Sequence, residues 1–303
     1  MSALVNEVAA TPREDAVPAP RGRWGTALVT GRRCLYACIG LVYLSAWTTA
    51  NRVACLLGFG RARLVILYYH SVPAAQRRRF ARQLEVIRAG ADAVVAADFC
   101  GTVAPGRLLV AITFDDAYVS VIDNALPELA VRGMTATIFT PSGMLGGQPG
   151  WQMEAADTDQ FETVANGEIL RTLPRELVSI GAHSVTHPRL PALDHASADA
   201  EIGGSKSALT SLLGHDVTMF SFPYGEYDDG TVELCRTAAF RFAYHTVPRM
   251  IDPADASFLR GRVRVDLADW DLEFWLKMRG GYNWQCGPRA LKRWLRRRVA
   301  RHR

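Results

Sequence analysis

Short apolar runs recur along most of this chain and are separated by longer stretches that mix apolar and polar residues. The runs are typical of β-strands, and several are apolar on both faces, as expected of a strand that is covered on both sides. The predicted strands are 64–69, 93–96, 108–114, 135–140, 178–182, 217–222, 240–246 and 262–265.

Helical periodicity appears between these strands, at residues 119–132, 196–213 and 231–239. Repeated strand, helix, strand order predicts parallel βαβ units, and therefore an α/β barrel or a doubly wound sheet. Residues 141–167 contain several Gly and Pro residues and predict a long loop. Loops of that length in a compact domain are often functional.

The region before the first strand divides into two parts. Residues 1–23 are rich in Ala, Pro and charge without periodicity, which predicts a disordered N-terminus. Residues 24–61 predict an apolar helix whose uncharged core, 34–50, is at the short limit for crossing a bilayer. Two interpretations remain open: a membrane anchor with an exported catalytic domain, or a helix packed on the outside of that domain.

Composition adds little about the fold but locates the charge. With 303 residues and 49% hydrophobic content, the chain can bury one sizeable core, which we place at residues 62–280. The net charge of +5 arises from the predicted basic helix at 281–303, because residues 288–303 hold eight Lys or Arg and no acid. This tail is either a membrane-surface contact or a solvated helix end. We expect no nucleic-acid partner, and the cellular location stays open, with membrane association slightly favoured.

Two adjacent carboxylates, Asp115 and Asp116, directly follow the apolar strand at 108–114. Burying an unpaired carboxylate costs several kcal/mol, so such a pair calls for a metal ion, a proton or a hydrogen-bond network. A simple capped turn is the alternative. His183 and His187 follow another strand, and four-residue spacing on a helical turn would place both imidazoles on one face. Together the four residues suit Zn²⁺ or a similar divalent ion.

Two more candidates follow predicted strands. Phe220 begins the run FSFPYG, in which Pro223 and Gly225 enforce a tight backbone around Tyr224, so that an N–H can face a developing oxyanion. His70 follows the first strand, and in α/β folds the carboxyl ends of strands share one face. In the long loop, Trp151 is the best candidate to stack on a sugar ring.

The runs TFDD, HSVTH and FPYG, in this order, resemble the polysaccharide deacetylase family, which is carbohydrate esterase family 4 or the nodulation-protein-B homology domain. YYHSV, GMTATIF and IGAHSVTHPRL between 64 and 265 support the resemblance. It implies a distorted (β/α) barrel with an N-terminal apolar helix and a basic C-terminal helix. It also implies a metal-dependent hydrolase, with one divalent ion such as Zn, that removes N-acetyl groups from oligo- or polysaccharides.

The same resemblance assigns roles to residues. Asp115 matches the general base, while Asp116, His183 and His187 match the metal ligands. Tyr224 matches the residue whose backbone N–H stabilises the oxyanion. His70 matches the general acid of a subgroup with permuted motif order.

One departure from the family concerns the cation that orients the catalytic Asp. The family often has Arg directly after the Phe of the third motif, but this chain has Ser221. Arg262 or Arg264, on the last predicted strand, is a candidate replacement. Without such a cation, the alternative is a barrel that binds glycan without catalysis. Hydrolysis of O-acetyl esters or of a non-carbohydrate amide is a further alternative.

Overall fold

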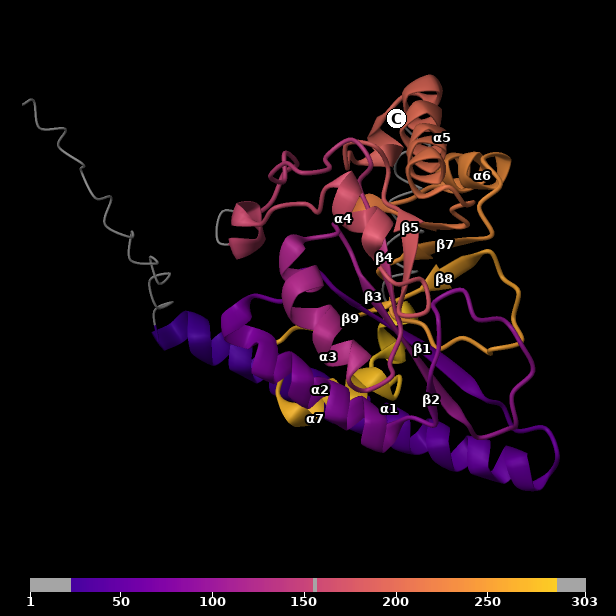
Figure 1. Ribbon diagram of the computed structural model, residues 1–303. Helices are drawn as coiled ribbons and strands as arrows, with labels where there is room; N and C mark the ends of the chain where they lie inside the picture. Colours follow the sequence, from indigo (N-terminus) through magenta and orange to yellow (C-terminus); the bar gives the residue numbers. More distant parts are fainter. Residues whose placement is uncertain (1–22, 155–156, 288–303) are drawn as a thin grey trace, which may run out of the picture.

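The computed structural model describes residues 23–154 and 157–287, and these residues form a curled parallel sheet with helices around it (Figure 1). The predicted N-terminal disorder and most of the predicted C-terminal basic helix lie outside the described residues. The strands are β1 (Arg63–Tyr69), β2 (Ala93–Val94), β3 (Leu108–Phe114), β4 (Ala136–Thr140), β5 (Val178–Ala182), β6 (Met219–Ser221), β7 (Phe242–His245), β8 (Leu259–Gly261) and β9 (Val263–Arg264).

The sheet is nearly closed into a barrel. Its strand order is β8-β7-β6-β5-β4-β3-β1-β9, with β2 paired to β3, and every pairing is parallel. The two end strands, β8 and β9, are separated in sequence by Arg262 alone. The chain therefore links the two ends of the sheet, which confirms the predicted distorted (β/α) barrel.

The helices are α1 (Arg23–Leu56), α2 (Arg77–Gly90), α3 (Leu126–Ala130), α4 (Gly167–Thr172), α5 (His195–Leu213), α6 (Asp229–Thr237) and α7 (Asp271–Met278). A short π-helix, Val121–Ala125, precedes α3. Of these, α1 coincides with the predicted apolar helix, and α3, α5 and α6 overlap the predicted helical stretches, whereas α2 and α4 were not anticipated. Short 3-10 turns complete the loops, including Thr158–Phe161 within the predicted long loop.

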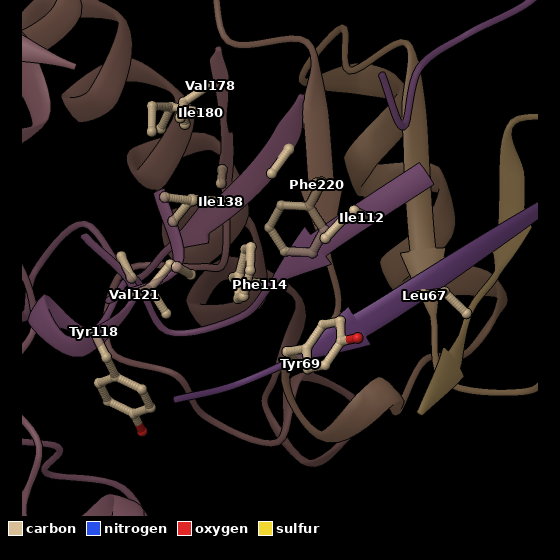
Figure 2. Packing of buried hydrophobic residues seen from close by; sticks show 14 of the residues in the cluster. Leu67, Tyr69, Ile112, Phe114, Tyr118, Val121, Ile138, Val178, Ile180 and Phe220 are labelled. Carbon is tan, nitrogen blue, oxygen red and sulfur yellow. The ribbon is translucent and has the colours of Figure 1, made fainter. Parts of the chain in front are cut away.

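Each long strand is buried on both faces, which explains its uninterrupted apolar run. In β1, Val65 and Leu67 face the core between sheet and helices, whereas Leu64 and Ile66 face a second cluster on the inner side. Figure 2 shows the outer core, where Tyr69 of β1 stacks on Phe114 of β3 with ring centroids 5.5 Å apart. Packing on both faces fixes the direction and register of the strands that end at the site.

Helix α1 runs along one side of the barrel, at the bottom of Figure 1. Its inner face buries Ala37 and Leu44 against Leu276 and Tyr282 of the C-terminal region. An ion pair between Arg33 and Glu273 adds to this contact. No helix in the described part of the chain combines the length and the hydropathy needed to cross a membrane.

Candidate active site

A cavity of about 640 Å³ opens at the carboxyl ends of the strands. The residues given catalytic, metal-binding or substrate-binding roles from the sequence all line it: His70, Asp115, Asp116, Trp151, His183, His187 and Tyr224. They come from segments that follow β1, β3, β4, β5 and β6. The parallel strands end at the same face of the sheet, so residues far apart in sequence meet there.

Asp116, His183 and His187 converge on one point. The Asp116 Oδ1 atom lies 3.7 Å from His183 Nε2 and 3.5 Å from His187 Nε2, and all three side chains are buried. Asp116 Oδ1 accepts no hydrogen bond within the described part of the chain. One carboxylate and two imidazoles that face each other at this spacing fit a divalent ion between them.

The electrostatics of these three ligands also fit a cation. Burial and the neighbouring Asp115 carboxylate raise the pKa of Asp116 well above its usual value. Burial lowers the pKa of His183 to about 4. Burial also lowers the pKa of His187, to about 2, and the neighbouring His183 adds to this effect. Both imidazoles are therefore neutral at neutral pH and keep a lone pair for a metal, which would also offset the cost of ionising Asp116.

The loop that carries the two histidines is not the helical turn that the sequence predicts, and that expectation is wrong. Residues 183–187 are irregular, and Ser184 and His187 have φ angles of 62° and 61°. The His187 N–H donates to Ser184 Oγ at 3.0 Å. Glu201 of α5 accepts hydrogen bonds from the N–H groups of Val185 and Thr186, both at 2.8 Å. A carboxylate from the helix that follows the loop thus holds the loop in shape.

Asp115 is held by a buried guanidinium. Arg262 donates from Nη1 to Asp115 Oδ1 at 2.7 Å and from Nη2 to Oδ2 at 2.8 Å, a bidentate geometry. Its Nη2 also donates to Ser221 Oγ at 2.7 Å. Burial opposes ionisation of Asp115, but the charge and hydrogen bonds of Arg262, together with His183 and His70, outweigh it, and the pKa falls to about 2. Of the two arginines that the sequence offers, Arg262 supplies the cation, while Arg264 lines the cavity.

The strand-ending turn Pro223–Gly225 places Tyr224 beside the imidazoles. Tyr224 and Gly225 have φ angles of 57° and 67°. The Tyr224 ring lies edge-on to His187 at 4.7 Å, and its hydroxyl donates to the carbonyl oxygen of Gln152 at 3.1 Å. A Cβ on Gly225 would lie 2.0 Å from Thr246 Oγ1, so only glycine fits this position. The turn is therefore sterically fixed.

The cavity also contains groups that sequence reasoning missed. Asp157 and Asp159 line it, and Ser71 donates to Asp159 at 2.5 Å. Burial raises the pKa of Asp159. His70 lies on the same wall, where burial lowers the pKa of its imidazole while Asp115 acts to raise it. The two aspartates carry no motif: Asp157 caps the short 3-10 turn Thr158–Phe161 and Asp159 lies in it, within a long loop whose path depends on packing.

Comparisons with known proteins agree with this architecture. Residues 103–243 match the polysaccharide deacetylase family model. YxkH of Bacillus subtilis (strain 168), whose name assigns it to the polysaccharide deacetylases, is 27% identical over 161 residues. The match covers 53% of each protein, so the chain spans about half the length of this curated relative.

Solved structures show the same fold. IcaB from Ammonifex degensii is 24% identical with a TM-score of 0.61, and the match covers 74% of this chain and 98% of that one. The Streptococcus pyogenes deacetylase PplD is 18% identical with a TM-score of 0.56, over 68% of this chain and 93% of that one. Fold and site thus define a distorted α/β barrel with a candidate Asp-His-His metal centre at its mouth. Residues 103–243, which match the polysaccharide deacetylase family model, include all three residues of this Asp-His-His cluster.

Proposed function

We propose that this protein is a metal-dependent hydrolase that removes N-acetyl groups from amino-sugar glycans. One observation carries the proposal. The Asp115 carboxylate, which is bound by Arg262, lies next to the cluster formed by Asp116, His183 and His187. This arrangement would combine a base with a metal centre in one cavity, which are the two parts that metal-assisted amide hydrolysis uses.

Asp116, His183 and His187 would hold the ion, and their mixture of carboxylate and imidazole favours zinc over magnesium or calcium. When bound, such an ion polarises a carbonyl group and lowers the pKa of a bound water. Asp115 then accepts one proton from the attacking water. Because Arg262 engages both of its oxygens, Asp115 is ionised at neutral pH and its position is fixed.

Water oxygen bonds to the amide carbon, and the carbonyl oxygen becomes an oxyanion that the Tyr224 N–H can stabilise. The C–N bond then breaks, leaving acetate and an amine. His70 is our candidate for the acid that protonates the nitrogen, as in the subgroup with permuted motif order. His70 must be protonated for this step. Burial lowers the pKa of its imidazole and so opposes protonation, whereas the charge of the nearby Asp115 carboxylate favours it.

The substrate we propose is an N-acetylated oligo- or polysaccharide, with Trp151 as an aromatic wall of the binding cavity. A barrel that binds glycan without catalysis was the main alternative, because Arg is absent at position 221. In the structure, the guanidinium of Arg262 contacts Asp115, so the absence of Arg at position 221 is no longer a reason to prefer a barrel without catalysis. O-acetyl esters and non-carbohydrate amides remain the competing substrates in the test.

Three variants test the roles of the carboxylates and the imidazole. Asp116→Ala and His187→Ala should lose bound metal and acetate release together. Asp115→Asn should keep stoichiometric metal and lose about 10²–10⁴-fold in turnover, the usual contribution of a general base. Metal content by mass spectrometry and acetate release from N-acetylated chitooligosaccharides, acetylated xylan and a non-sugar acetamide are the measurements. Full metal occupancy in Asp116→Ala, or full turnover in Asp115→Asn, would refute the assignment.

We also propose that the outer face of α1 contacts an anionic membrane surface. An exposed apolar stripe follows helical spacing along it and consists of Leu35, Ile39, Val42, Val53 and Leu56. A helix with apolar residues on two opposite faces normally has both faces covered, and the barrel covers only the inner face of α1. Residues 23–56 include Arg32 and Arg52 but no acid. Anionic lipid complements this charge, whereas a second copy would bring only like charges together.

A further inference from the structure

The two candidate metal-binding imidazoles are held in different ways. The ring of His183 is fixed by a hydrogen bond between its Nδ1 and the carbonyl oxygen of Ser221, at 2.6 Å. This bond requires a proton on Nδ1, which leaves the Nε2 lone pair facing Asp116. His187 also turns its Nε2 towards Asp116, but its buried Nδ1 has no hydrogen-bond partner within the described part of the chain.

Aromatic rings surround His187 in place of that hydrogen bond. The indole of Trp151 packs against the face of the imidazole at a tilt, with ring centroids 4.5 Å apart and an angle of 32° between the planes. Tyr224 and His183 meet the same ring edge-on, each with centroids 4.7 Å away. Stacking at this distance restricts how far the imidazole can rotate.

The segment that carries Trp151 is tied to both neighbouring loops. After β4, Ser142 and Gly143 donate their N–H groups to the carbonyl oxygens of Ser184 and Val185, at 3.1 and 2.8 Å. Further along, the Gln152 carbonyl oxygen accepts the hydrogen bond of the Tyr224 hydroxyl. Trp151 is thus placed by contacts with the histidine loop on one side and with the Tyr224 turn on the other.

We propose that Trp151 is a positioning residue for the metal centre, which orients the His187 imidazole as the Ser221 carbonyl orients His183. The inference rests on the proposed metal-dependent function, since it assigns a role at the same site. The positioning role of Trp151 differs from a sugar-stacking role because it orients His187 before any substrate binds. Within the described part of the chain no hydrogen bond at Nδ1 holds the His187 ring, so packing by its aromatic neighbours is what keeps Nε2 directed at Asp116.

Zinc affinity of the full-length protein tests the proposal. Loss of a group that orients a metal ligand typically weakens binding by about 10–100-fold, which is the expected rise in the zinc dissociation constant for Trp151→Ala. Trp151→Phe keeps a stacking ring and should retain most of the affinity. Trp275→Ala removes another half-buried indole, away from the cavity, and should leave zinc binding unchanged. Competition with a chromophoric chelator gives the constants.

A second measurement needs neither metal nor turnover. In the metal-free protein, NMR signals of the His187 ring should broaden or shift in Trp151→Ala while those of His183 stay in place, because Ser221 still holds His183. If Trp151→Ala binds zinc like the wild type and only raises KM for the glycan, Trp151 is a sugar platform and the proposal is overturned. A wild-type protein that binds no zinc would instead overturn the proposed function as well.

Discussion

At the scale of single residues, the site depends on a guanidinium that reaches it from an unexpected place in the chain. Ser221 stands where the family often has Arg, and its hydroxyl accepts a hydrogen bond from Arg262. The small side chain at position 221 leaves room for a long one from between β8 and β9. The guanidinium that contacts Asp115 therefore comes from a different part of the chain than position 221.

Replacing Arg262 with Ala should shift the pH dependence of activity. Unopposed burial would raise the pKa of Asp115, now about 2, above its ordinary value, so the acidic limb of the pH profile moves to higher pH. Stability should fall by about 3–5 kcal/mol, because a buried carboxylate loses its partner. The contribution of Asp115 to stability also changes sign. At present it is lost as the pH falls through about 2, whereas in the variant it is lost as the pH rises.

Arg260 provides a matched control for this prediction. It is also fully buried, but it donates to the backbone carbonyl oxygens of Ala97, Phe99 and Asp255 rather than to a carboxylate. Arg260→Ala should destabilise the protein without moving the acidic limb. Activity measured against pH and urea unfolding distinguish the two variants, and an unshifted profile in Arg262→Ala would count against the role of Arg262.

At the scale of elements, the chemistry lies in irregular segments that regular strands hold in place. The strands end in register, but the residues that follow them adopt left-handed conformations at Asp116, His187 and Tyr224. Such φ angles cost about 1–2 kcal/mol each for residues other than glycine, and packing must supply that energy. The site therefore owes its shape to loop contacts such as those of Glu201, which local sequence preference does not encode.

Gly225→Ala tests whether the turn after β6 is sterically determined. A methyl group there would overlap Thr246, so the turn must shift and displace the neighbouring Tyr224 N–H. We expect a loss of stability and of acetate release. Gly214, the cap residue of α5, has nearly the same φ, 69°, but open space around its Cβ position. Gly214→Ala should therefore cost only the strain of about 1–2 kcal/mol and keep full activity.

At the scale of the whole molecule, α1 gives the barrel one face that differs from the rest. The helix lies along the barrel (Figure 1). Its inner side is packed, and its outer side carries the exposed apolar stripe. Its position was not determined by sequence, because an uncharged stretch at residues 34–50 is compatible with a membrane span and with a packed helix alike. In the structure, contacts with α7 bury the inner face of α1 against the barrel.

Binding to lipid vesicles tests the proposed role of this stripe. The protein should cosediment with phosphatidylglycerol vesicles and not with phosphatidylcholine vesicles, and high salt should weaken the binding. Val42→Glu should reduce it by about tenfold, because a buried Val contributes about 1.5 kcal/mol. Val131→Glu, at the end of α3, is a control of similar exposure, 77% against 70%. Equal binding by both variants, or a stable dimer that forms through α1 instead, would contradict the proposal.

Sequence alone determined the parts of this protein that depend on local pattern. Apolar runs located the strands because burial on both faces leaves no polar position. Asp115, Asp116, His183 and His187 stood out because such groups rarely follow buried strands without a reason. Tertiary structure decided the rest: which arginine meets Asp115, how the histidine loop bends, what supports His187, and where α1 packs. These contacts join residues that are far apart in sequence, so they depend on how the folded elements pack together. No local sequence pattern predicts them.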